Sequence, residues 1–229
     1  MINTKPIRPR DASSLIIYRP NADGFDVLMG RRHKDHVFMP NRLVFPGGAI
    51  DSEDRRVIPG TNLKVDVAAR LTRTLTPTRA RALAAAAVRE TYEETGLFLA
   101  APVNQRPKNK LANWQAFYDR EMGPALGALD YFFRAVTPPG NVRRYDARFF
   151  LTSAEHTQGD IAGDGEIIDI GWYDLAIVKT DPSVHGITAR VLSEAEIVLM
   201  NPGLLQKRGA RHSRHINGKQ VITVEGEQS

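Results

Sequence analysis

The segment from Thr76 to Gly96 gives the strongest secondary-structure signal in this chain and predicts a helix over residues 77–95. Threonine is a favoured N-cap, and proline fits the first helical position, where its missing N–H costs nothing. Alanine, the best helix former, occupies positions 80, 82 and 84–87. Gly96 supplies the stop signal. Both ends of this helix are therefore predicted together with its interior.

The last two turns of the predicted helix carry three glutamates, Glu90, Glu93 and Glu94. At about 100° per residue they fall within an arc of about 100°, so one face holds three like charges. Such charges repel by roughly 0.2–0.5 kcal/mol per pair, and the helix dipole disfavours them near a C-terminus. A hard divalent cation would compensate them. The alternative is a solvated acidic face that Arg89 partly neutralises by pairing with Glu93.

Strands are predicted around this helix from aromatic and β-branched content. Residues 14–19 and 25–29 predict a hairpin, and residues 43–45 a short strand that ends at Pro46-Gly47-Gly48. The two glycines indicate a backbone that turns sharply and comes close to another group. Further strands are predicted at 97–99, 131–136, 147–152 and 166–173, and further helices at 111–121 and 187–200.

Two segments are predicted to lie outside this core pattern. Residues 51–76 are polar and weakly periodic, which favours a surface insertion. The chain after residue 201 is a basic tail, in which Asn217-Gly218 between short apolar pairs signals a β-hairpin. We therefore expect one domain over residues 1–201 and a tail over residues 202–229.

Two motifs, Phe45-Pro46-Gly47-Gly48 and Arg89-Glu90 followed by Glu93-Glu94 and Gly96, together resemble the Nudix box of the Nudix hydrolase family. Gly48 takes the place of the first box glycine, and Asp54 stands six residues later, where the family has glutamate. Thr91 stands at an apolar position of the box. Between Asp54 and Arg89 lie 34 residues instead of the usual seven, so we assign residues 55–75 as an insertion. A similar split box occurs in the branch that resembles peroxisomal coenzyme A diphosphatases.

The resemblance implies an α/β fold, the Nudix α/β/α sandwich with a mixed β-sheet. It also implies metal-dependent hydrolysis of a diphosphate linkage in a nucleoside diphosphate derivative. Glu90, Glu93 and Glu94 would hold Mg²⁺ or Mn²⁺, and Glu90 would also orient or deprotonate the attacking water. Arg89 would orient the box carboxylates, while Gly47 and Gly48 would pass close to metal and substrate.

Three residues outside the box are further candidates. Glu166 lies in an acidic, glycine-rich loop, and in Nudix enzymes a carboxylate from such a loop often joins the metal site; a plain turn is the alternative. Arg144 and Arg148 could clamp a substrate phosphate bidentately. Because they alternate with aromatic residues on a predicted strand, they could equally face solvent.

Composition limits the remaining function classes. The chain has no cysteine, which excludes disulfides, thiolate metal sites and a cysteine nucleophile and fits a reducing cytosol. No apolar stretch approaches the roughly 20 residues of a membrane span, so we expect a cytoplasmic protein with no membrane partner. The net charge of +5 suits an anionic ligand, but scattered basic residues with few aromatics make nucleic acid an unfavoured partner.

Several substrates and one non-catalytic role stay open at this stage. The split box favours coenzyme A or an acyl-CoA, while NADH, ADP-ribose and capped RNA ends are alternatives. A Nudix fold can also serve as a non-catalytic nucleotide-binding module after losing its carboxylates, although all three box glutamates are present here. A homodimer is a further hypothesis.

Overall fold

The computed structural model describes residues 7–35, 39–108, 110–163, 165–216 and 218–226. Within these residues, nine strands form a mixed sheet in the order β11-β10-β7-β8-β1-β2-β3, with β4 pairing to β1 and β9 to β2. The strands of this sheet are β1 (Arg10–Pro20), β2 (Phe25–Arg32), β3 (Leu43–Val44), β4 (Gly47–Ala49), β7 (Asp130–Val136), β8 (Tyr145–Ser153), β9 (Ile167–Asp174), β10 (Arg211–Ile216) and β11 (Lys219–Val224). A separate pair, β5 (Ala100–Pro102) and β6 (Met122–Pro124), lies outside it.

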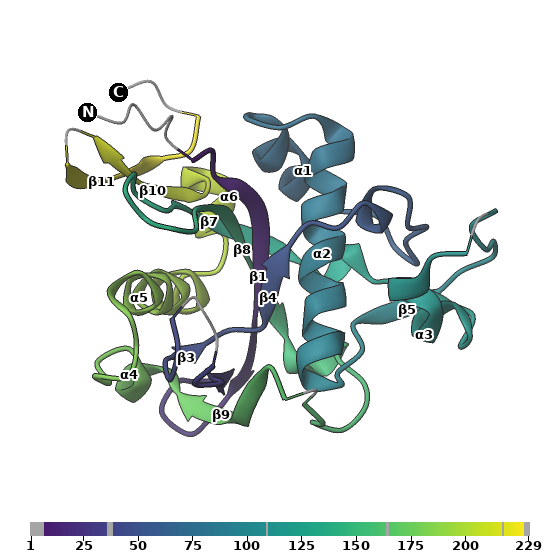
Figure 1. Cartoon of the computed structure of the whole chain (residues 1–229), viewed down its shortest axis with the longest axis horizontal. Helices are drawn as coiled ribbons and strands as arrows, with labels where there is room; N and C mark the ends of the chain where they lie inside the picture. Colours follow the sequence, from purple (N-terminus) through teal and green to yellow (C-terminus); the bar gives the residue numbers. More distant parts are fainter. Residues whose placement is uncertain (1–6, 36–38, 109, 164, 217, 227–229) are drawn as a thin grey trace.

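Helices cover both faces of the sheet (Figure 1). On one face, α2 (Pro77–Thr95) packs in a core with Leu15, Ile17 and Phe150. On the other, α5 (Gly186–Met200) packs in a second core with Ile16 and Phe149. Neighbouring residues of β1 and β8 thus point into the cores on opposite faces of the sheet, because successive side chains of a strand alternate between the two faces. The predicted α/β fold with its α/β/α layering is confirmed.

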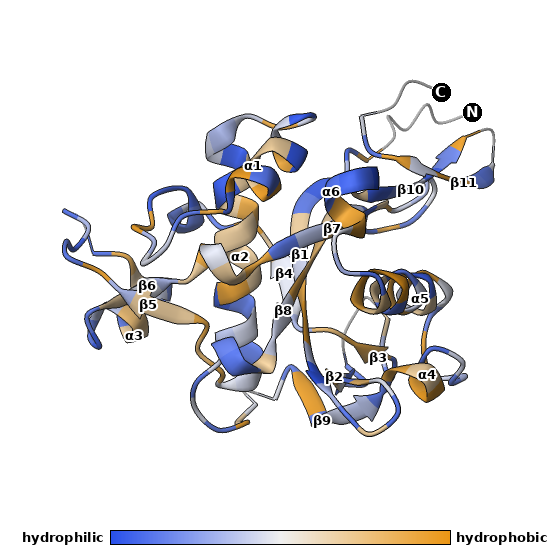
Figure 2. Ribbon diagram, turned by 180° about the vertical axis from the view of Figure 1, so that it is seen from behind, coloured by the Kyte–Doolittle hydropathy of each residue, from blue (hydrophilic) through white to orange (hydrophobic). Residues whose placement is uncertain are grey.

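Helix α2 has the predicted ends. The Thr76 side chain accepts a hydrogen bond from the backbone N–H of Arg79, and Gly96 closes the helix with a left-handed φ of 76°. Along the helix, the hydrophilic residues (blue in Figure 2) are concentrated in the half that ends at Thr95. The helix therefore presents an apolar first half to the core and a polar second half to the site described below.

The elements that follow α2 differ from the sequence-based prediction. Instead of a strand at 97–99, Phe98 forms a single bridge with Gln158, and β5 begins at Ala100. The helix expected at 111–121 is reduced to a 3₁₀ turn at 112–114 and the short helix α3 (Gln115–Tyr118). Aromatic packing explains this outcome, because Phe98 contacts both Tyr92 and Phe117 and so fixes the chain by side-chain contacts rather than by a ladder.

The segment expected to be a surface insertion is partly core. It contains α1 (Val65–Thr72), whose side chains Val67 and Leu71 are fully buried, and Val57 and Leu75 are buried beside them. These residues belong to the same core cluster as the apolar face of α2. The prediction of a surface excursion was wrong because a two-turn amphipathic helix needs only two or three apolar residues to bury one side.

Helix α6 (Leu204–Arg208) and the strands β10 and β11 make up most of the chain after residue 201. Strand β10 pairs antiparallel with β11 and parallel with β7, so the segment expected to be a tail extends the central sheet. Of the hairpin signal, Asn217 lies outside the described residues, and Gly218 has a φ of 76°. In the described part of the chain, no helix has the length and apolar character to cross a bilayer.

Strand β1 creates a gap in the sheet that positions the site. Along one edge it pairs with β8 throughout, whereas its other edge pairs with β4 at residues 12–14 and with β2 only at residues 18–20. Between these two partners the backbone N–H of Leu15 bonds the carbonyl of Pro46, at 3.1 Å. The gap brings Gly47 and Gly48, on β4, against the second half of α2.

Candidate functional site

The two halves of the predicted box meet in space. A Cβ atom placed on Gly48 would lie 2.5 Å from the carboxyl carbon of Glu90, so only glycine allows this approach. Gly47 has a φ of 154°, and a Cβ there would meet the Ser13 carbonyl oxygen at 2.4 Å. The expectation that the backbone comes close to another group here is thus met at both glycines.

Glu94 is the most deeply buried of the three box glutamates. Its side chain accepts a 2.7 Å hydrogen bond at Oε2 from the backbone N–H of Gly47. The other oxygen, Oε1, is buried and has no hydrogen-bond partner among the described residues. Burial, together with the charge of Glu90, raises the pKa of Glu94 well above its ordinary value. Oε1 is therefore the atom through which an ionised Glu94 could bind a cation.

Glu90 lies between this buried carboxylate and the helix surface. Burial raises the pKa of Glu90 to about 7, against the opposing effect of Arg89. A carboxyl group with such a pKa exchanges protons near neutral pH, which suits a general base. Glu93 is more exposed, with 36% of its side-chain surface accessible, and it pairs with Arg89 at 2.8 Å.

Arg89 connects the acidic residues of the box. Its Nη1 donates to both Glu90 and Glu93 at 2.8 Å, and its Nη2 donates to the backbone carbonyl of Ala49 at 3.0 Å. Nε and Nη2 also form a bidentate pair with Asp54 at 2.9 and 3.0 Å. Burial alone would lower the pKa of Arg89, but the hydrogen bond to Asp54 and three nearby carboxylates raise it. Arg89 is therefore a fixed cation at the centre of the box.

Asp54 is a structural member of the site that the sequence analysis did not propose. It is completely buried and, besides Arg89, accepts hydrogen bonds from Trp114 Nε1 at 3.2 Å and from the backbone N–H of Asp51 at 2.8 Å. Its position in the box motif was the available signal. The shorter aspartate pairs with Arg89 on the buried side of the site and does not line the cavity.

Glu166 reaches the same region from the loop before β9. It pairs with Arg32 on β2 at 3.3 Å, and the charges of both residues act on the pKa of Glu94, Arg32 lowering it and Glu166 raising it after the dominant effect of burial. Within the described ranges, no group of three or more metal-ligating side chains is already assembled. Glu90, Glu94 and Glu166 are thus brought to one region but not into one coordination shell.

A cavity of about 620 Å³ opens beside these residues. Glu90, Glu166 and Arg32 line it together with Gly47 and Gly48. Its remaining walls come from β1, β7, β8, the N-terminus of α5 and the β10–β11 hairpin. This size is typical of a site for a small-molecule ligand.

Comparison with known structures identifies the arrangement of elements. A solved Nudix hydrolase from Alicyclobacillus acidocaldarius superposes with a TM-score of 0.67 over 89% of this chain and 97% of that one, at 24% identity. The chain has the Nudix fold. A MutT Nudix hydrolase from Burkholderia pseudomallei matches less closely, with a TM-score of 0.47 and 17% identity over 82% of this chain and 98% of that one.

Comparison at the level of sequence gives one curated relative and no matching family model. The relative is an acyl-coenzyme A diphosphatase from Xenopus laevis, 24% identical in an alignment that covers 73% of this chain. The chain spans 57% of that protein's length. The predicted resemblance to Nudix hydrolases of the coenzyme A diphosphatase type is therefore confirmed as a resemblance.

The two arginines predicted to bind substrate do not reach the cavity of this Nudix fold. Arg148 is 1% exposed and pairs with Asp146 at 2.7 Å, on the face of β8 opposite to the cavity-lining Phe149. Arg144 donates to the backbone carbonyls of Thr137 and Ile7. Strand alternation is the reason, since a phosphate clamp would need Arg148 on the other face. Arg143, which was not proposed, lines the cavity instead.

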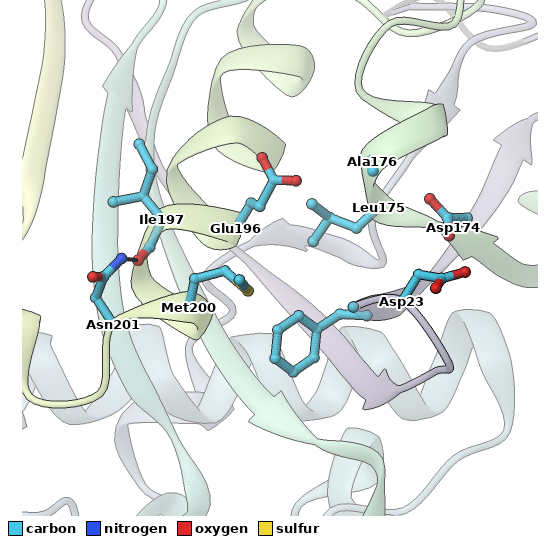
Figure 3. Close-up of a pocket in the computed structure, with 10 residues that line it drawn as sticks. Asp23, Asp174, Leu175, Ala176, Glu196, Ile197, Met200 and Asn201 are labelled. Atoms are coloured by element: carbon cyan, nitrogen blue, oxygen red, sulfur yellow. Dashed lines mark hydrogen bonds between the residues drawn. The ribbon is translucent and has the colours of Figure 1, made fainter.

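A second cavity, of about 330 Å³, lies between the β1–β2 turn, α4 (Leu175–Val178) and α5 (Figure 3). It contains no residue of the Nudix box. Two of its acidic residues are engaged, because Asp174 caps the backbone N–H of Ile177 and Glu196 pairs with Lys179. This cavity therefore does not compete with the box as the reaction site.

Proposed function

We propose that this chain is a metal-dependent hydrolase that cleaves a diphosphate linkage in a nucleoside diphosphate derivative. The observation that carries the proposal is the buried, unpartnered Oε1 of Glu94, whose neighbours Gly47 and Glu90 line the 620 Å³ cavity. A solvated acidic face, the alternative reading of the three glutamates, would not bury Glu94 to 1% exposure.

The donor set fits Mg²⁺ or Mn²⁺. Both ions prefer carboxylate oxygens, and Glu90, Glu93, Glu94 and Glu166 are the residues that would hold them. When bound, such an ion would neutralise the diphosphate charge and lower the pKa of a coordinated water. Glu94 is the anchor of this set, because the Gly47 N–H fixes one of its oxygens and leaves the other unsatisfied.

The other residues of the site have roles that follow from their contacts. Glu90, with its pKa near 7, is the candidate to accept a proton from the attacking water. Arg89 holds Glu90 and Glu93 in place, and Asp54 holds Arg89. Arg32 lines the cavity and places a positive charge beside the region where a phosphate would lie.

Coenzyme A and its acyl derivatives are the first substrates to test, because a curated relative is an acyl-coenzyme A diphosphatase. NADH, ADP-ribose and capped RNA ends remain alternatives within the same reaction class. A non-catalytic nucleotide-binding module is the alternative outside it.

The test is a screen of these diphosphates with Mg²⁺ or Mn²⁺, with phosphate release measured after a phosphatase is added. We expect turnover that excess chelator abolishes. Glu90→Gln, Glu93→Gln and Glu94→Gln should each fold and lose activity by orders of magnitude, whereas Glu155→Gln, at an exposed position, should not. Near wild-type turnover in all three box variants would show that these glutamates do not carry the reaction, and absence of turnover with every compound would favour the binding module.

A further inference from the structure

The floor of the cavity is a row of small residues that crosses five strands. Ala49 pairs with Ala12, Ala12 with Ala147, Ala147 with Ala135, and Ala135 with Ser213. All five residues line the cavity. Because larger side chains are absent from this row, it leaves a trench across the sheet, from the Nudix-box strand β4 to the C-terminal strand β10.

The trench is longer than a diphosphate. From β4 to β10 there are four inter-strand steps. At about 4.8 Å per step, the floor extends roughly 19 Å. Apolar side chains, including Phe45, Phe149 and Ile187, line the cavity above it. A substrate whose diphosphate lies at the box therefore has room for a long substituent toward the hairpin.

The two ends of the trench differ in charge. The carboxylates that line the cavity, Glu90 and Glu166, lie at the box end, where Arg32 pairs with Glu166. Toward the other end the lining residues include Arg143 and His215, and no carboxylate pairs with Arg143 among the described residues. His215 Nδ1 is buried without a hydrogen-bond partner, and the neighbouring Gln220 donates to Ser213.

Arg143 and His215 line the same cavity at the end away from the box. The recorded β7–β10 pairing ends at Ser213 and Ala135, and His215 follows Ser213 by two residues, on the same face of β10. Thr137 bonds through its backbone to Tyr145, which follows Arg143 by two residues. Arg143 and His215 therefore approach the cavity from adjacent chain segments, some two to four strand steps from β4.

We propose that the substrate carries a second phosphate, a monoester separate from the scissile diphosphate, and that Arg143 and His215 recognise it. A guanidinium without a carboxylate partner and an imidazole that lines the same cavity are groups that can bind such a phosphate by charge-assisted hydrogen bonds. This inference rests on the proposed function and names a substrate class within it. It adds the C-terminal hairpin to the residues that determine specificity.

Pairs of compounds that differ by one phosphate monoester test the proposal, namely NADPH against NADH and coenzyme A against dephospho-coenzyme A. We expect the wild-type kcat/KM to favour the phosphorylated member at least about tenfold, the effect of one charge-assisted contact. Arg143→Gln and His215→Gln should each remove most of that preference through KM, with the dephosphorylated member unaffected. Arg190→Gln, on the exposed surface of α5, should leave the preference unchanged.

Calorimetric binding of the same four compounds to wild-type protein in chelator gives a readout that does not need turnover. If no compound is hydrolysed, the proposed reaction fails for these substrates, yet a binding preference that Arg143→Gln abolishes would still support the phosphate site. Equal binding within both pairs, with no change in the variants, would overturn the inference even if all four compounds are hydrolysed.

Discussion

At the scale of single residues, the Nudix box is organised around one buried cation. Arg89 lies between Asp54, which is fully buried, and the two glutamates Glu90 and Glu93, of which Glu90 lines the cavity. The charge that orients the reactive carboxylates is therefore itself anchored in the core. Removing one partner from a buried ion pair is costly because the remaining charge stays desolvated.

We predict that Asp54→Asn destabilises the protein by about 3 kcal/mol and lowers turnover at the same time, because Arg89 loses its bidentate partner. Urea unfolding and steady-state kinetics measure the two effects. Asp23→Asn, at an exposed turn, is the control and should change neither. A fully stable Asp54→Asn protein would mean that the pair contributes nothing to folding.

A second residue-scale prediction concerns His212, whose burial lowers its pKa to about 4, with a further contribution from the charge of Arg134. Below about pH 6.5 the unfolded chain protonates this histidine while the folded protein does not. Stability should therefore fall as the pH decreases from about 6.5 to about 4.

We expect wild type to lose roughly 2 kcal/mol more than His212→Gln between pH 7.5 and 4.5 in the free energy of unfolding. His33→Gln, at a more exposed histidine, should behave like wild type. Parallel pH curves for His212→Gln and wild type would contradict the assignment of a buried neutral imidazole.

At the scale of elements, α1 shows how a polar sequence can hide a core helix. Its exposed positions are Val65, Ala69 and Thr72, and of its three buried residues, Val67, Arg70 and Leu71, only Val67 and Leu71 are apolar. Leu71→Ala should cost 2–5 kcal/mol, the usual range for a buried leucine. Val65 is 87% exposed at the start of the same helix, so Val65→Ala should change the free energy of unfolding by no more than about 0.5 kcal/mol. Thermal melts of the two variants test this difference.

Local signals predicted the elements whose determinants are adjacent in sequence. The ends of α2 follow from Thr76, Pro77 and Gly96, and the β1–β2 hairpin follows from the two apolar runs that the turn residues 20–24 separate. The elements that depend on distant packing were missed. Phe98 is held by Phe117 rather than by a strand partner, and α1 is held by α2.

The same division holds for the site. The box residues could be read from their spacing, whereas the cavity walls come from β8, α5 and the hairpin, which no local pattern brings together. The prediction for Arg148 failed because the sequence does not show which side of the sheet each residue of the strand faces. Alternate residues face opposite sides, and Arg148 lies on the side of the α2 core, whereas its neighbours in the strand face the cavity.

At the scale of the whole molecule, the Glu225 side chain links the C-terminal hairpin to the segment after α1 and to β7. It is 2% exposed and accepts hydrogen bonds from Thr74 after α1, from Arg134 on β7, and from the Tyr131 hydroxyl. Its own backbone N–H bonds the carbonyl of Ala210, before β10. The C-terminal hairpin is thus attached to the sheet by side chains as well as by the β7–β10 ladder.

We predict that Glu225→Ala destabilises the protein by about 3 kcal/mol, because buried donors lose their acceptor. The hairpin should also open more often, so trypsin should cut at Arg214 and Lys219 faster in the variant. Limited proteolysis followed by mass spectrometry locates the cuts. An unchanged cleavage pattern would show that the ladder alone holds the hairpin.

The parallel pairing of β1 with β8 can form only late in synthesis, after β8 has been made. Arg10 pairs with Tyr145, which follows 135 positions later in the chain. At about 5–20 residues per second, the ribosome needs on the order of ten seconds to make that stretch. During this time β1 has its early partner β2 but lacks the strand that flanks it along its full length. Until β8 has been made, the nascent chain therefore exposes the unpaired edge of the apolar strand β1, which is the kind of surface that chaperones bind.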